Sequence, residues 1–267
     1  MNNLESIDIE PFPIIENVFE IYSKMEKYIF LPLATINFKN HKVLNNKSFH
    51  FISIWDNGSY EDVYFNDFRK EIRIIKFKMV DNKYLYPINP KFPSIQFLND
   101  AYNIIEQNFN ENIDYYLTPK NYSKFTHEDK TLYNGAELIR NSINEFDRFD
   151  SAYYFERITQ YLYAKRKFEL FEKINPSFTY SETFIGLLTT RENVISEFHD
   201  EGKTKTEIIN NLLDEPQWIQ NPEEILKNLN LTFIGSISEN NFTNGSAEIY
   251  LFWDRIKNEV YQFIQWT

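Results

Sequence analysis

Three short segments near the end of the sequence decide the fold class: Leu231-Thr-Phe-Ile-Gly-Ser-Ile237, Ala247-Glu-Ile-Tyr-Leu-Phe-Trp253 and Glu259-Val-Tyr-Gln-Phe-Ile-Gln-Trp266. All three are rich in the aromatic and β-branched residues that favour strands. The residues Asn244-Gly245 and Lys257-Asn258 stand between them and are typical of hairpin turns. The pattern therefore predicts an antiparallel meander of three strands at this end of the chain.

A second group of strands is predicted nearer the start of the sequence. Apolar and polar residues alternate over 29–38, 47–55, 69–80 and 83–88, and turn residues such as Asp81-Asn82 lie between these ranges. The alternation changes phase at Ile74-Ile75, which predicts a β-bulge. Before these strands, residues 12–28 have apolar side chains at helical spacing and predict one amphipathic helix.

The middle of the sequence is predicted to be helical. The spacing indicates helices over 94–109, 128–174, 192–198 and 205–213, with a break in the long one near Phe149-Asp150-Ser151. We therefore expect an α+β fold, in which antiparallel β segments at both ends of the chain flank a central helical block. The predicted regions are 1–92, 93–213 and 214–267, forming one compact unit or two closely packed subdomains.

Composition excludes several kinds of chemistry. The 267 residues include no Cys, which excludes disulfides, thiolate metal ligands and a cysteine nucleophile. The 4 His residues are scattered, and the 6 Gly residues form neither of the familiar phosphate-binding motifs. We therefore predict no catalytic residue, no metal ligand and no cofactor site.

The negative charge is concentrated in the last third of the chain. Of the net charge of −11, residues 175–267 carry −8, from six Lys and Arg against fourteen Asp and Glu. Such a surface repels nucleic-acid phosphates and anionic lipids, and it attracts basic proteins. The expected partner is therefore a basic protein, with no nucleic acid and no membrane. The sequence has neither a secretory signal nor an apolar run long enough to span a bilayer, which favours the cytoplasm.

Six residues of this acidic part are candidates for partner binding. Four carboxylates, Asp200, Glu201, Asp214 and Glu215, are predicted to steer a basic partner electrostatically. Trp218 lies between two predicted helices, neither of which requires a large aromatic residue, so it is the candidate anchor. Gln220, two residues further on, completes the candidate set.

The same part of the sequence resembles a known family. The matching residues are Pro216, Trp218, Ile219 and Gln220, then Phe233 and Ile237, then Gly245, Tyr250 and Phe252. In their order and spacing they resemble the C-terminal part of the YwqG-like family, a bacterial family of uncharacterised function. The chain departs from the family pattern at Asp214-Glu215, Ser236 and Asn244. The resemblance implies an α+β fold without an established enzymatic site, and some relatives are associated with toxin–immunity loci.

Three functional hypotheses follow. The first is a cytoplasmic bacterial protein-interaction protein of immunity type, which neutralises a basic partner such as a toxin. The second is a metal-independent enzyme or small-ligand binder, with a cleft lined by carboxylates and tyrosines. The third is a structural or regulatory domain whose acidity keeps it soluble. The sequence predicts no oligomeric state.

Overall fold

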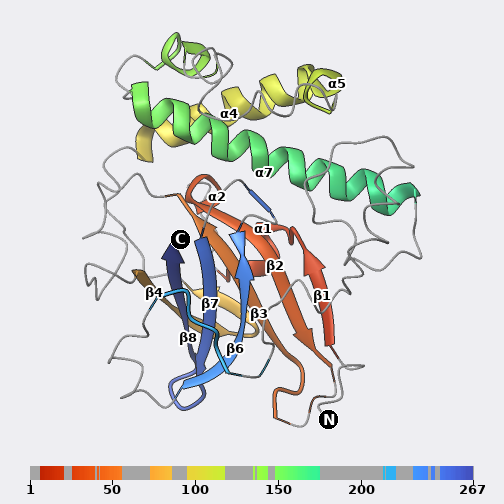
Figure 1. Cartoon of the computed structure of the whole chain (residues 1–267), viewed down its shortest axis with the longest axis vertical. Helices are drawn as coiled ribbons and strands as arrows, with labels where there is room; N and C mark the ends of the chain where they lie inside the picture. The colour runs from red at the N-terminus through yellow and green to blue at the C-terminus, as the bar shows by residue number, and fades with distance from the viewer. Residues whose placement is uncertain are drawn as a thin grey trace. The chain divides into compact units, whose positions relative to one another are not determined.

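A computed structural model describes residues 7–20, 26–39, 41, 43–55, 73–85, 95–117, 135, 137–143, 148–174, 213, 215–220, 231–239, 242–243 and 247–266. The chain has an α+β fold, with antiparallel strands towards both ends and helices in the middle (Figure 1). It divides into two compact units. The first comprises residues 1–92, 209–239 and 246–267, and the second comprises residues 93–208 and 240–245.

The first unit contains a three-stranded antiparallel sheet from the start of the chain. Its strands are β1 (Ile7–Pro11), β2 (Phe30–Phe38) and β3 (Lys47–Ile54), in that spatial order. Thr35 of β2 lies opposite His50 of β3. The two predicted strands over 29–38 and 47–55 are confirmed, and β1 is an addition that the sequence pattern did not predict.

A five-stranded antiparallel sheet joins the two ends of the sequence. Its order is β5 (Lys83–Leu85), β4 (Arg73–Val80), β8 (Glu259–Trp266), β7 (Ala247–Asp254) and β6 (Leu231–Ser238). The predicted meander is β6-β7-β8, whose strands lie side by side in Figure 1. Pairing of β4 with β8, for example Lys76 with Tyr261, brings residues that are far apart in the sequence into one sheet.

The five-stranded sheet has two chemically different faces. Its inner face, which contacts the three-stranded sheet, carries Phe77, Trp253 and Gln262; the Phe49 and Trp253 rings meet edge to face with centroids 5.6 Å apart. Its outer face carries an apolar cluster of six buried residues, called the outer aromatic cluster below: Ile74, Phe233, Tyr250, Phe252, Tyr261 and Phe263. Successive residues of β7 and β8 are buried, and successive side chains point to opposite faces of a sheet. Both faces of these strands are therefore largely buried.

Burial of both faces explains why the predicted bulge at Ile74-Ile75 is wrong. The pairing of β4 with β8 runs through this position without a shift, and both isoleucines are buried. The register shifts that do occur place Leu33 of β2 and Ile234 of β6 as extra residues. The carbonyl of Leu33 accepts a hydrogen bond from the Phe12 N–H at 2.8 Å, and that of Ile234 accepts one from the Leu213 N–H at 3.0 Å. Both donors have left-handed backbone, with φ of 48° and 55°.

The helix predicted over residues 12–28 is not continuous. The described part consists of two short helices, α1 (Ile15–Val18) and α2 (Glu26–Ile29). Phe19 is extended and pairs with Tyr84, and the Glu20 N–H donates to the Tyr84 carbonyl at 3.0 Å. The Phe19 ring stacks on Phe30, so a tertiary contact overrides the helical spacing at this point.

Most of the described residues of the second unit are helical. They include the helices α4 (Ile95–Glu111), α5 (Ile113–Tyr116) and α7 (Arg148–Ile174), and helical residues at 135 and 137–140; α4 packs against α7. The helix predicted over 94–109 is confirmed. The predicted break near Phe149-Asp150-Ser151 is misplaced, because α7 already begins at Arg148. The helices predicted over 192–198 and 205–213 lie outside the described residues, apart from Leu213, which is in a turn.

Candidate functional site

The described part of the predicted partner-binding site is the segment 215–220. It contains Glu215, Trp218 and Gln220, whereas Asp200, Glu201 and Asp214 lie outside the described residues. The segment forms neither helix nor strand. Contacts with the five-stranded sheet, described next, hold the segment in position.

Trp218 packs on the outer aromatic cluster. Its ring lies 4.7 Å from the Tyr250 ring and 5.8 Å from the Phe252 ring, centroid to centroid, at interplanar angles of 30° and 10°. Stacked aromatic pairs of this kind add to the stabilisation from burial alone. Trp218 is half-buried, so its ring is fixed by the sheet while part of its surface remains accessible to solvent.

Four hydrogen bonds, three of them to its backbone, hold the segment on either side of Trp218. The Tyr250 hydroxyl accepts from the Ile219 N–H at 3.0 Å and donates to the Gln217 carbonyl at 2.9 Å. The Gln220 N–H donates to Oε1 of Gln265 at 3.1 Å, and the Gln220 side-chain amide donates to the Trp266 carbonyl at 3.0 Å. Burial raises the pKa of Tyr250 above its usual value, so the hydroxyl keeps the proton that it donates.

The residues next to Trp218 face solvent. Glu215 and Gln220 are exposed, and Ile219 retains 44% of its surface. The segment thus presents a carboxylate, part of an indole ring and an aliphatic side chain from a backbone that is held in place. Such an arrangement can bind another protein without much loss of conformational entropy, because the anchor is already ordered.

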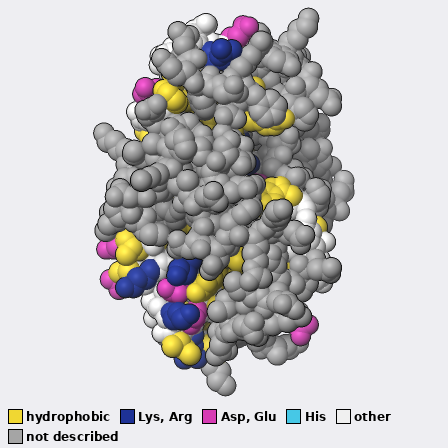
Figure 2. Space-filling model, turned by 90° about the vertical axis from the view of Figure 1, so that its left-hand side faces the viewer, with side chains coloured by type: hydrophobic (Ala, Val, Ile, Leu, Met, Phe, Trp, Pro, Cys, Tyr) yellow, Lys and Arg dark blue, Asp and Glu magenta, His cyan; other side chains and the backbone are white. Residues whose placement is uncertain are grey.

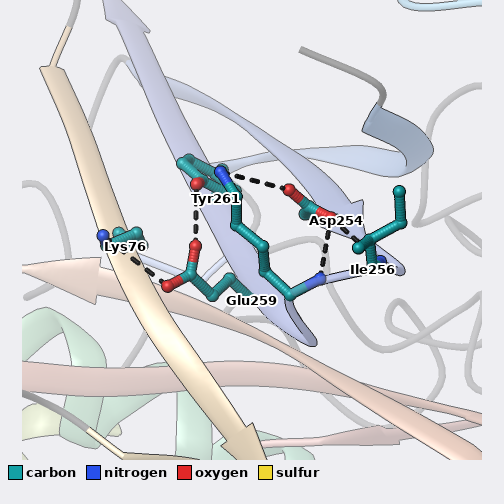
Figure 3. Close-up of polar contacts among 6 residues, drawn as sticks. Lys76, Asp254, Ile256, Glu259 and Tyr261 are labelled. Carbon is teal, nitrogen blue, oxygen red and sulfur yellow. Dashed lines mark hydrogen bonds and ion pairs between the residues drawn. The ribbon is translucent and has the colours of Figure 1, made fainter.

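A group of carboxylates and a tyrosine lies further along the same face, near the turn between β7 and β8 (Figure 3). Glu259 contacts Lys76 Nζ at 3.7 Å and accepts a hydrogen bond from the Tyr261 hydroxyl at 2.9 Å. Asp254 accepts from the backbone N–H groups of Ile256 at 2.9 Å and Lys257 at 3.0 Å. Those hydrogen bonds, first among them the one from Lys257, lower the pKa of Asp254. Both carboxylates are thus engaged in contacts within the fold.

A buried polar network, which the sequence reasoning missed, lies on the inner side of the first unit. His50 is only 2% exposed, its Nδ1 is 2.8 Å from the Thr35 hydroxyl and its Nε2 is 2.7 Å from the Asn82 carbonyl. Since a carbonyl can only accept, Nε2 carries the proton and Nδ1 accepts from Thr35. Burial lowers the pKa of His50 to about 4, which keeps the ring neutral. His50 therefore links the two sheets and is not placed to transfer protons to a substrate.

The strand β3 is joined to the five-stranded sheet by further side chains. Gln262 accepts from the Ile52 N–H at 3.0 Å and donates to the Ile52 carbonyl at 2.7 Å. The Tyr84 hydroxyl accepts from the His50 N–H at 2.8 Å, and the Ser53 hydroxyl donates to the buried carboxylate of Glu239. No spacing rule relates these positions, because 210 residues separate Ile52 from Gln262.

The described residues hold no group of three or more His, Cys, Asp or Glu side chains that could bind a metal ion. Nor do they include a helix long and apolar enough to cross a membrane. Comparison of the chain with protein-family models, with curated proteins and with solved structures finds no match. The resemblance to the YwqG-like family thus remains a prediction from the C-terminal sequence.

Proposed function

We propose that this chain is a protein-interaction protein of immunity type, and that it neutralises a basic partner through a surface that includes residues 215–220. The observation that supports this most directly is the immobilised, half-buried Trp218 beside the exposed Glu215 and Ile219. Interface hot spots are commonly tryptophans that lie in packed, partly desolvated surroundings.

Electrostatics support a basic partner. Glu215 is the described member of a run of nine carboxylates between residues 192 and 224: Glu192, Glu197, Asp200, Glu201, Glu207, Asp214, Glu215, Glu223 and Glu224. Charges at the rim of an interface mainly accelerate association and select the partner, whereas the central aromatic residue slows dissociation. We therefore assign steering to Glu215 and anchoring to Trp218.

The proposal is tested by affinity capture from the source cells, followed by binding measurements with the purified partner. We expect a basic protein, an affinity at least about 30-fold lower for Trp218→Ala, and a slower association for Glu215→Lys at low salt. Glu16→Lys is a matched control, because Glu16 is an exposed carboxylate on α1. Capture of no basic protein, or full affinity for it in both variants, would show that this surface is not the binding site.

A further inference from the structure

The turn between β7 and β8, residues 255–258, exposes an apolar side chain. Ile256 retains 83% of its surface, more than any other exposed large hydrophobic residue among those the structure describes. Because it stands at the tip of a hairpin, neighbouring side chains do not shield it. An isolated exposed isoleucine has little meaning by itself, so its significance depends on how it is held and on what surrounds it.

Five hydrogen bonds hold this turn in one conformation. Besides the two bonds that Asp254 accepts from the Ile256 and Lys257 N–H groups, the Trp253 indole N–H donates to the Asn258 side-chain oxygen at 3.3 Å. The Asn258 side-chain amide donates to the Met79 carbonyl at 2.8 Å, and the Met79 N–H donates to the Asn258 carbonyl at 2.9 Å. The turn is thus tied to β4 as well as to its own strands, and Ile256 is presented on a rigid support.

Two cationic side chains flank the exposed isoleucine in the sequence, and two more lie on the strand that pairs with β8. Arg255 and Lys257 flank it in the sequence, and Lys76 and Lys78 lie on the adjacent strand β4. Figure 2 shows Lys and Arg side chains gathered with hydrophobic and acidic ones at the lower end of one face of the molecule. Within the described part of the chain, Lys257 pairs with Asp254 and Lys76 pairs with Glu259, but Arg255 and Lys78 have no carboxylate partner.

We propose that the β7–β8 turn is a second interaction surface, which inserts Ile256 into an apolar pocket with an acidic rim on a protein partner. The cations Arg255 and Lys78 complement the rim. A protein pocket fits this surface better than an anionic bilayer does, because the turn offers one apolar side chain and the chain as a whole carries a net charge of −11. This surface is distinct from residues 215–220: Tyr250 and Asp254 are four residues apart on β7, about 13 Å along the strand.

A photo-cross-linker at the tip of the turn tests this inference directly. Ile256 is replaced by p-benzoylphenylalanine in the full chain, and the source cells are irradiated. We expect one predominant cross-linked protein with an acidic surface. Its affinity for the unmodified chain, measured with both proteins purified, should fall at least about tenfold for Ile256→Ser and for Arg255→Glu, and it should fall at high salt.

Two control variants show whether the effect is specific to this turn. Val43→Ser changes another exposed aliphatic residue, 52% accessible, and should leave the affinity unchanged. Glu215→Lys should leave the cross-link unchanged, so failure of the site at 215–220 would not affect this result. The inference is overturned by the absence of a cross-link, by a cross-link to a second copy of the chain, or by full affinity of Arg255→Glu. The chain is also mixed with vesicles of phosphatidylcholine and phosphatidylglycerol. If it binds them and Ile256→Ser does not, the turn binds a membrane surface, and the inference of a protein partner is likewise overturned.

Discussion

Replacement of Gln262 by leucine should weaken the attachment of the three-stranded sheet to the five-stranded sheet. The side-chain amide of Gln262 acts as a substitute strand: it accepts from the Ile52 N–H and donates to the Ile52 carbonyl. The strand β3 lies at the edge of its sheet, where every second residue points its backbone N–H and carbonyl away from the neighbouring strand. Ile52 is one of these residues. Both residues have no surface accessible to solvent, so water cannot take the place of the lost amide.

The expected cost follows from the two backbone groups that lose their partners. A buried donor or acceptor without a hydrogen bond costs about 1–3 kcal/mol, so the pair costs about 2–6 kcal/mol. Leucine is more apolar than glutamine and of similar size, so its burial stabilises the folded state by about 1–2 kcal/mol and offsets part of this cost. We therefore expect Gln262→Leu to lower the free energy of unfolding of the first unit by about 2–3 kcal/mol, the difference between the centres of these two ranges. This is a large share of a total stability of about 5–15 kcal/mol.

Urea denaturation followed by tryptophan fluorescence measures this change selectively. The 4 tryptophans, Trp55, Trp218, Trp253 and Trp266, all belong to the first unit. Gln217→Leu makes the same substitution at an exposed position of that unit and should change stability by less than about 0.5 kcal/mol. Equal midpoints and slopes for Gln262→Leu and Gln217→Leu would refute the reasoning, because the buried amide would then contribute nothing.

Three further predictions concern other parts of the molecule. The pKa of His50 is about 4 in the folded state and 6.5 in the unfolded chain, so the unfolded state binds more protons between these values and stability falls as the pH falls. Between about pH 7.5 and pH 5 the loss should be about 2 kcal/mol, and His50→Gln, measured by urea denaturation at both pH values, should abolish this part of the pH dependence. Gly135→Ala places a methyl group against the Phe155 ring, so it should destabilise the second unit by about 1–3 kcal/mol in thermal unfolding followed by circular dichroism, and stabilisation would contradict the packing. Tyr250→Phe removes the hydroxyl between Gln217 and Ile219, so hydrogen exchange at Ile219 should become about tenfold faster, whereas an unchanged rate would show that Tyr250 does not hold the segment.

Local sequence patterns predicted the strands better than the helices near them. The alternation over 47–55 and 83–88 reflects side chains that point to opposite faces, and this local property survives in β3 and in the described strand β5. The helix over 12–28 failed at Phe19, where pairing with Tyr84 and stacking on Phe30 fix an extended backbone. The bulge at Ile74-Ile75 failed for a related reason, since a strand buried on both faces can change its polarity pattern without any change in pairing.

The pairing between distant segments had no local signal. Nothing in the spacing of Gln262 or His50 indicates that one reaches Ile52 and the other reaches Asn82. The candidate site was predictable in part: Trp218 stood out because no helical or strand pattern required it. Its support could not be predicted, because the rings of Tyr250 and Phe252 face Trp218 only once β7 is placed in the sheet.

We expect the two faces of the five-stranded sheet to contribute differently, the inner face to stability and the exposed atoms beside the outer face to the proposed binding. On the inner face, polar side chains such as Gln262 and Tyr84 satisfy the backbone of β3, so changes there should act on the free energy of unfolding. On the outer face, Trp218 and the β7–β8 turn are each fixed by hydrogen bonds yet retain exposed surface, so changes to their exposed atoms should act on affinity. A variant such as Ile256→Ser leaves the hydrogen bond of its own backbone N–H in place and should unfold at the same urea concentration as the unmodified chain. If it instead unfolded as early as Gln262→Leu, the turn would belong to the structural core, and its exposure could not be attributed to a binding role.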